Sequence, residues 1–167
     1  MSILHDEIFE QPAALKNALE TNRDAIAALA ADIKRRDISY VVLAARGTSD
    51  NAAIYAKYLI QIVCGIPVAL AAPAVHTLFD AEVKFKGALV IGISQSGAGE
   101  DINEVITQAK RSGALTAAIT NTADAPLAGI ADHVLYCNAG VERAVAATKT
   151  YTTTLALIAS LVVAWSG

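Results

Sequence analysis

The spacing of apolar residues along the chain changes period several times, and each change marks an expected boundary between elements. From Pro12 to Arg36 the apolar residues recur every three or four positions, which predicts one helix over this range. From Tyr40 to Ala45 the chain is continuously apolar, and a turn of small and polar residues follows. Such a run is typical of a strand buried in a parallel sheet.

The same criteria predict the remaining elements. Further strands are expected at Pro67–Ala71, Ala88–Ile93, Leu115–Thr120 and His133–Cys137. Helices are expected at Asn51–Cys64, Val75–Val83 and Gly99–Arg111, around Pro126, and in the later part of Ala139–Ala164. Five strands alternating with helices predict an α/β fold, namely a three-layer αβα sandwich with a five-stranded parallel sheet and a nucleotide-binding-like topology.

Three small polar residues, Ser94, Gln95 and Ser96, follow directly after the expected strand Ala88–Ile93. The turn after a strand presents free backbone N–H groups at the positive end of the next helix. Gly97 and Gly99 keep side chains away, so an anion can approach the backbone closely. The pattern predicts an anion site, although an ordinary capped turn has the same composition.

A second turn of this kind, Gly47-Thr48-Ser49, follows the strand Tyr40–Ala45. In open parallel sheets ligands bind outside the carboxyl ends of the strands. Both turns are expected at that edge, so two independent patterns predict one site.

The composition fits a single domain with an aliphatic core. The chain has 167 residues, of which 54% are hydrophobic and only 5% aromatic. The formal net charge is −3 and the basic residues are scattered apart from Lys34-Arg35-Arg36, so we expect no nucleic-acid-binding surface. That triplet is placed to stabilise the carboxyl end of a helix.

Cellular location is predicted from three features. Cys64 and Cys137 are far apart in apolar segments without metal-ligand spacing, which predicts buried thiols in a reducing compartment. Acidic residues interrupt the N-terminal segment, so no signal peptide is expected. The most apolar stretch, Leu155 to Trp165, is too short to span a bilayer. We therefore expect a cytoplasmic protein without a membrane partner.

Three segments together resemble the sugar isomerase (SIS) domain family. They are Gly47-Thr48-Ser49, Ser94-Gln95-Ser96-Gly97 and the run AGVERAVAATKTY from Ala139 to Tyr151. They are most similar to the first of the two SIS domains in the isomerase half of glucosamine-6-phosphate synthase and its glutaminase-free relatives, which include glucosamine-6-phosphate deaminases. The resemblance implies that residues 1–167 are a single SIS domain, the N-terminal half of a two-SIS-domain protein.

The resemblance also implies a set of substrate-binding residues. Ser94, Gln95 and Ser96 would hold the phosphate of a sugar phosphate, a task that hydroxyl and amide groups can perform without a lysine. Thr48 and Ser49 would contact the sugar, and Val145 would line the pocket. The expected set is Gly47, Thr48, Ser49, Ser94, Gln95, Ser96, Gly97 and Val145.

Two positions depart from the synthase pattern. Gly99 stands where the synthases have a threonine that helps to hold the phosphate, so that hydrogen bond has no side-chain counterpart here. Arg46 stands where the synthases usually have cysteine, and in this it is similar to the glutaminase-free relatives. Its guanidinium could pair with a substrate phosphate or form a salt bridge with Asp50 or Asp101, and the salt bridge is the favoured alternative.

The sequence leaves the catalytic residues open, with Glu142 and Lys149 as candidates. Glu142 is either a base for proton transfer between C1 and C2 of a sugar or, as the favoured alternative, a structural cap of the last helix. Lys149 is either a partner of the sugar or a charge on a helix surface. His76 and His133 are expected to serve the fold. In the family, the ring-opening and proton-transfer groups belong to the second domain or to a neighbouring subunit.

Two functional hypotheses follow. The first is a phosphosugar-binding domain of a sugar-phosphate isomerase, aminotransferase or deaminase. It would act on substrates of the glucosamine-6-phosphate and fructose-6-phosphate type by ring opening and 1,2-proton transfer, without metal or organic cofactor. The alternative is a non-catalytic sugar-phosphate-sensing module. In both cases we expect a homodimer or pairing with a second SIS domain, and this chain alone need not turn substrate over.

Overall fold

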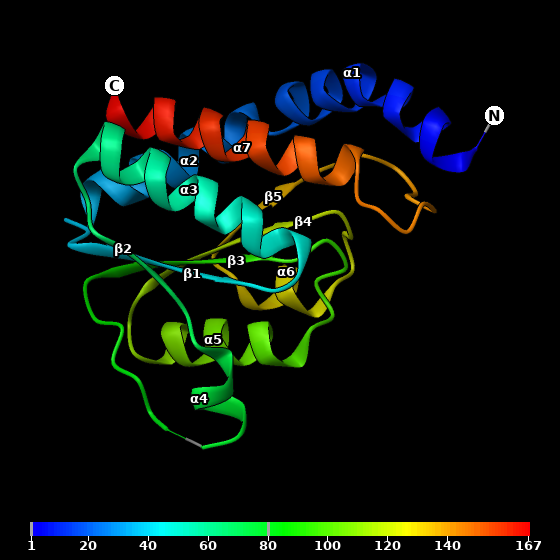
Figure 1. Cartoon of the computed structure of the whole chain (residues 1–167). Coiled ribbons are helices and arrows are strands. Elements are labelled where there is room, and N and C mark those ends of the chain that lie inside the picture. The colour runs from blue at the N-terminus through cyan, green and yellow to red at the C-terminus, as the bar shows by residue number, and fades with distance from the viewer. Residues whose placement is uncertain (1, 80) are drawn as a thin grey trace.

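The computed structural model of the chain describes residues 2–79 and 81–167, and a five-stranded parallel sheet forms its centre (Figure 1). The strands are β1 (Tyr40–Ala45), β2 (Val68–Leu70), β3 (Ala88–Ile93), β4 (Leu115–Thr120) and β5 (His133–Tyr136). Their order across the sheet is β2-β1-β3-β4-β5, and each neighbouring pair is parallel. The sequence therefore placed β1, β3 and β4 correctly to the residue.

Helices cover both faces of the sheet and complete the predicted three layers (Figure 1). One face carries α1 (Ile3–Thr21), α2 (Arg23–Arg35), α3 (Thr48–Cys64) and α7 (Lys149–Ser166). The other carries α4 (Pro73–Thr77), α5 (Glu100–Arg111) and α6 (Pro126–Ile130). Alternate residues of β1 divide between the two cores, since Val41 and Leu43 pack on the first side and Val42 and Ala44 on the second.

The single helix expected over Pro12–Arg36 is instead two helices that meet at Asn22. The side chain of Asn22 is buried and bonds to strand β5: its Oδ1 accepts from the N–H of Tyr136 at 2.8 Å and its Nδ2 donates to the carbonyl of Tyr136 at 2.8 Å. These bonds hold the break against the sheet edge. Helix α1 also begins earlier than expected, after the cap Ser2.

The helix expected over Val75–Val83 was misplaced. Helix α4 starts at Pro73, a residue suited to a first helical turn, and ends at Thr77. Leu78 and Phe79 are exposed, so no buried apolar face extends the helix. Asp80, also within the expected range, lies outside the described residues.

The other boundaries differ by only a few residues. Helix α3 starts at Thr48 rather than Asn51, because Gly47 turns the chain with φ +59° just before it. The last helix starts at Lys149.

Burial raises the pKa of both thiols, although Cys64 is only partly buried while Cys137 is buried. In the part of the chain that the structure describes, no helix has the length and apolar character needed to cross a membrane.

Candidate functional site

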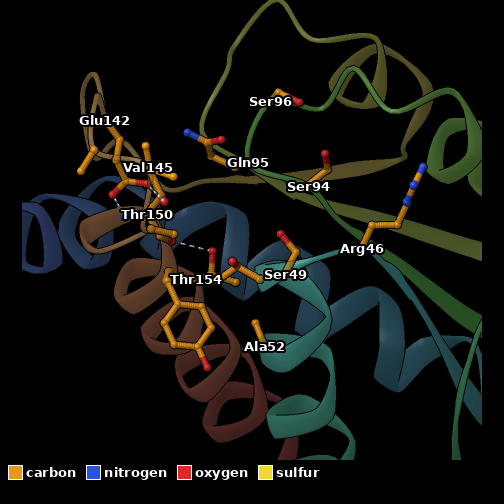
Figure 2. Close-up of a pocket in the computed structure, with 14 residues that line it drawn as sticks. Arg46, Ser49, Ala52, Ser94, Gln95, Ser96, Glu142, Val145, Thr150 and Thr154 are labelled. Carbon is orange, nitrogen blue, oxygen red and sulfur yellow. Dashed lines mark hydrogen bonds between the residues drawn. The ribbon is translucent and has the colours of Figure 1, made fainter. Parts of the chain in front are cut away.

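Three segments meet at the carboxyl edge of the sheet and enclose a pocket of about 350 Å³ (Figure 2). One segment is the β1–α3 turn, one is the β3–α5 turn, and the third is the loop that leads into α7. Together with the starts of α3 and α7, they supply the lining residues Arg46, Thr48, Ser49, Ala52, Ser94, Gln95, Ser96, Glu142, Ala144, Val145, Ala147, Thr150, Tyr151 and Thr154. The volume lies within the range of small-molecule sites.

Strand register explains why the two predicted turns come together. Strands β1 and β3 are neighbours in the sheet, and their last residues, Ala45 and Ile93, are paired. Two parallel strands that end at the same level deliver their following turns to the same place. The turns predicted separately from the sequence therefore form one site.

The β3–α5 turn is tied by hydrogen bonds to the end of strand β4 and the residue after it. The N–H of Ser94 donates to the carbonyl of Ile119 at 3.0 Å, and the carbonyl of Gln95 accepts from the N–H of Asn121 at 3.0 Å and from Oγ1 of Thr120 at 3.2 Å. These bonds fix the first two residues of the turn.

The donors of this turn remain available to a ligand. Oγ of Ser94 accepts from the N–H of Gly97 at 3.1 Å, and Oγ of Ser96 accepts from the N–H of Ala98 at 3.4 Å. A hydroxyl that accepts still has its own O–H to donate. Within the described residues, the N–H groups of Gln95 and Ser96 have no acceptor. The turn therefore offers several donors to an anion.

Gly97 and Gly47 shape the two turns rather than line the pocket. Gly97 has φ +61°, and a Cβ on it would lie 2.5 Å from the Cβ of Ala125. Gly47 has φ +59° and precedes α3. Within the described residues, the N-cap residues of α3 and α5 make no side-chain cap hydrogen bond, and an uncapped helix N-terminus favours negative charge nearby.

Arg46 lies at one side of the pocket and pairs with the first turn of α5. Its Nη1 is 3.2 Å from Oδ2 of Asp101, while the Arg46 side chain is 73% exposed. The favoured alternative of a salt bridge is confirmed, with Asp101 rather than Asp50 as the partner.

Glu142 both lines the pocket and caps helix α7. Its Oε1 accepts from the N–H and the hydroxyl of Thr148, both at 3.0 Å, and from the N–H of Thr150 at 3.2 Å, while its Oε2 accepts from the Thr150 hydroxyl. Burial acts to raise the pKa of Glu142, but the hydrogen bonds from Thr150 and Thr148 outweigh it and hold the pKa below its usual value. The cap is confirmed, and a carboxylate so stabilised is a weak base.

Lys149 is neither a surface charge nor a lining residue of the pocket. Its side chain is buried and forms an ion pair with Glu10 of α1. The surface interpretation was wrong because α1 begins early enough to cover the start of α7, an arrangement that the sequence did not predict.

Helix α1 also holds the loop that forms one wall of the pocket. The buried carboxylate of Glu7 accepts from the N–H of Arg143 at 2.6 Å and from the N–H of Ala144 at 3.1 Å. Next to these residues, Val145 is fully exposed at the pocket rim. Glu7 of α1 therefore holds the loop in place, while the apolar side chain of Val145 faces solvent.

Several lining residues were missed as individual candidates. They are Ala52, Ala144, Ala147, Thr150, Tyr151 and Thr154. Thr150 and Thr154 are four residues apart, so one face of α7 carries both hydroxyls. That spacing in the segment TYTTT was the available signal.

The two histidines serve the fold, as expected. Nδ1 of the buried His76 is 2.7 Å from Oε1 of Gln108, and Nε2 of His133 is 2.8 Å from Oδ2 of Asp32. Neither histidine lines the pocket.

Comparison with known proteins identifies relatives of the whole chain. The profile of the SIS domain family matches residues 36–164. The isomerizing glutamine–fructose-6-phosphate aminotransferase of Thermococcus kodakarensis is 38% identical over 158 residues, which are 94% of this chain and 26% of that protein. The chain therefore spans about a quarter of the length of the curated relatives it matches.

Solved structures agree with this result. A protein of Silicibacter pomeroyi DSS-3, described as a candidate phosphosugar isomerase, matches with a TM-score of 0.96 and 37% identity over 99% of this chain and 51% of its own. The C-terminal domain of glucosamine-fructose-6-phosphate aminotransferase from Francisella tularensis matches with a TM-score of 0.83 and 28% identity over 99% of this chain and 47% of its own. With this sheet, these turns and the match over residues 36–164, the chain belongs to the SIS domain family.

Proposed function

We propose that this chain is the phosphosugar-binding domain of an enzyme that isomerises, aminates or deaminates a sugar phosphate of the glucosamine-6-phosphate or fructose-6-phosphate type. The observation that carries the proposal is the Ser94-Gln95-Ser96 turn, whose three residues line one pocket and have hydroxyl and backbone donors without an acceptor among the described residues. Hydroxyl and N–H donors suit phosphate oxygens. The names of the relatives support the same substrate class.

In this proposal the chain binds and orients the substrate. Ser94, Gln95 and Ser96 hold the phosphate, and the hydroxyls of Thr48 and Ser49 contact the sugar. The reaction is ring opening followed by proton transfer between C1 and C2 through an enediol or enolamine. A held phosphate keeps the open chain in a single position for that transfer.

We further propose that the base for proton transfer comes from outside this chain. Glu142 is occupied by the start of α7, and Lys149 is paired with Glu10. A second SIS domain, or a neighbouring subunit, would place its own groups over the open side of the pocket. The chain would then be the first of two SIS domains, and the reaction would need neither metal nor organic cofactor.

A sensing module is the second candidate function, and one observation favours it. The ionisable carboxylate of the pocket, Glu142, accepts four hydrogen bonds and has a lowered pKa, which suits structure better than catalysis. A domain of this kind would bind a sugar phosphate without converting it.

The test is calorimetric titration of the chain with glucosamine-6-phosphate, fructose-6-phosphate and unphosphorylated glucosamine, together with assays for ammonia release and ketose formation. Binding of the phosphorylated sugars alone supports the proposed pocket. Turnover by the monomeric chain would contradict an external base and return Glu142 and Lys149 to the catalytic candidates. Equal binding of glucosamine and its phosphate would exclude a phosphate site.

A further inference from the structure

Two lining residues of the pocket carry a formal charge at neutral pH, Arg46 and Glu142. Figure 2 shows them on opposite sides of the Ser94-Gln95-Ser96 turn. A phosphate is repelled by the carboxylate and attracted by the guanidinium. The electrostatic potential is therefore more positive on the Arg46 side of the pocket than on the Glu142 side. The anionic end of a ligand is expected on the side of Arg46.

Arg46 has donors to spare for such a ligand. A guanidinium has five N–H donors in a planar fork that matches phosphate oxygens. In the described structure the Arg46 side chain donates to Asp101 through Nη1, and it is otherwise 73% exposed. The remaining donors can therefore meet a phosphate without breaking the salt bridge.

The surroundings of Asp101 limit the space that its carboxylate can occupy beside Arg46. The carboxylate is only 18% exposed and belongs to the first turn of α5, directly after the β3–α5 turn. A Cβ on Gly99 would lie 3.3 Å from Oδ1 of Asp101, closer than most real contacts. Glycine at position 99 thus leaves the space that the carboxylate occupies.

We propose that Arg46 is a phosphate-binding residue that gives the pocket its preference for phosphorylated ligands, and that Asp101 is its positioning residue. The inference rests on the proposed function and adds to it. In the proposed function alone, neutral hydroxyl and N–H donors bind the phosphate. With Arg46, a positively charged side chain also binds it.

The experiment compares wild type with Arg46→Gln, Arg46→Lys and Asp101→Asn by calorimetric titration with fructose-6-phosphate, fructose and inorganic phosphate. For Arg46→Gln we expect a loss of fructose-6-phosphate affinity of about tenfold or more, since a hydrogen bond to a charged group is removed. Arg46→Lys keeps the charge without the fork, so its loss is smaller. Fructose, which lacks the phosphate, is expected to bind weakly or not at all, and to do so equally in wild type and in all three variants.

The variant Asp101→Asn tests whether Asp101 positions Arg46 for phosphate binding. Asparagine keeps an acceptor for Arg46 but holds a guanidinium less strongly than a carboxylate does, so we expect a loss of fructose-6-phosphate affinity that is smaller than the loss in Arg46→Gln. If Arg46→Gln and Asp101→Asn lose fructose-6-phosphate affinity only in proportion to a matching loss of thermal stability, the pair is structural and the inference is overturned. Wild-type affinity in Arg46→Gln would overturn it while leaving the proposed function intact. A wild type that binds neither fructose-6-phosphate nor inorganic phosphate would overturn both.

Discussion

Glu10 in the first half of α1 forms an ion pair with Lys149, the first residue of α7. The Lys149 side chain is 4% exposed, whereas that of Glu10 is 55% exposed. A buried ammonium is costly unless it is paired, so Lys149 depends on this carboxylate. The pair links α1 to the helix that carries one side of the pocket.

Glu10→Gln is expected to lower the free energy of unfolding by about 1–3 kcal/mol, less than for a fully buried pair because Glu10 is largely exposed. Lys149→Met removes the charge and keeps the length of the side chain, so it should cost less than Glu10→Gln. In the Lys149→Met background, Glu10→Gln should have almost no effect. Urea unfolding measures all four proteins, and an unaltered stability of Glu10→Gln alone would contradict the dependence.

The double variant Ser94→Ala, Ser96→Ala tests the anion site. Hydrogen bonds to a charged phosphate contribute roughly 1.5–3 kcal/mol each, so sugar-phosphate affinity should fall by at least about tenfold. Calorimetric titration with fructose-6-phosphate measures the change. Ser166→Ala, an exposed serine at the end of α7, is the matched control. If the double variant binds as tightly as wild type, these hydroxyls do not hold the phosphate.

Gly97→Ala is expected to destabilise the chain by about 2 kcal/mol or more, because alanine is strained at φ +61° and its methyl group meets the Cβ of Ala125. Thermal and urea unfolding measure the loss. Gly129→Ala in α6 is the matched control, since no atom lies within 4 Å of a Cβ there. Alanine is preferred to glycine in a helix by about 0.5–1 kcal/mol, so the control should be neutral or stabilised.

Glu142→Gln should change how stability depends on pH. The folded pKa of Glu142 lies below the usual value of about 4.3, so the carboxylate stabilises the fold above that pH. This contribution is lost as the pH falls through the folded pKa. Urea unfolding at pH 7 and again below about pH 4 should therefore show a difference between wild type and Glu142→Gln that shrinks in acid.

The exposed Glu82 provides the control for this pH series. Glu82→Gln should follow the wild type closely at both pH values. A constant difference between wild type and Glu142→Gln would mean that the amide loses packing or geometry rather than a charge.

The three central strands and both polar turns could be predicted because local pattern decides them. The continuous apolar runs of β1 and β3 need burial on both faces, and parallel strands then bring their following turns to one edge. The place of the pocket could therefore be predicted from the turns that contain Ser94 and Thr48, without knowledge of any contact.

Contacts distant in sequence could not be predicted in this way. Lys149 is a charged residue, which the sequence alone would place on the surface. It is buried because α1 packs over it and supplies its partner Glu10, which is 139 residues away in the sequence. Arg46 had two candidate carboxylates, and only the register of β1 and β3 selects Asp101. Side-chain pairing depends on the tertiary arrangement, which apolar periodicity does not contain.

Asn22 is another such position, because its periodic neighbours suggest one continuous helix while its side chain completes the edge of β5. Asn22→Ala should lower the free energy of unfolding by about 2–3 kcal/mol, since the N–H and carbonyl of Tyr136 both lose their partner. Asn22→Asp keeps the acceptor but directs a carboxylate at the carbonyls of Ala18 and Tyr136, so it should cost more. Asn51→Ala, on the exposed side of α3, is the matched control in urea unfolding. If Asn22→Ala unfolds like this control, the break between α1 and α2 is set by the surrounding core and not by the asparagine.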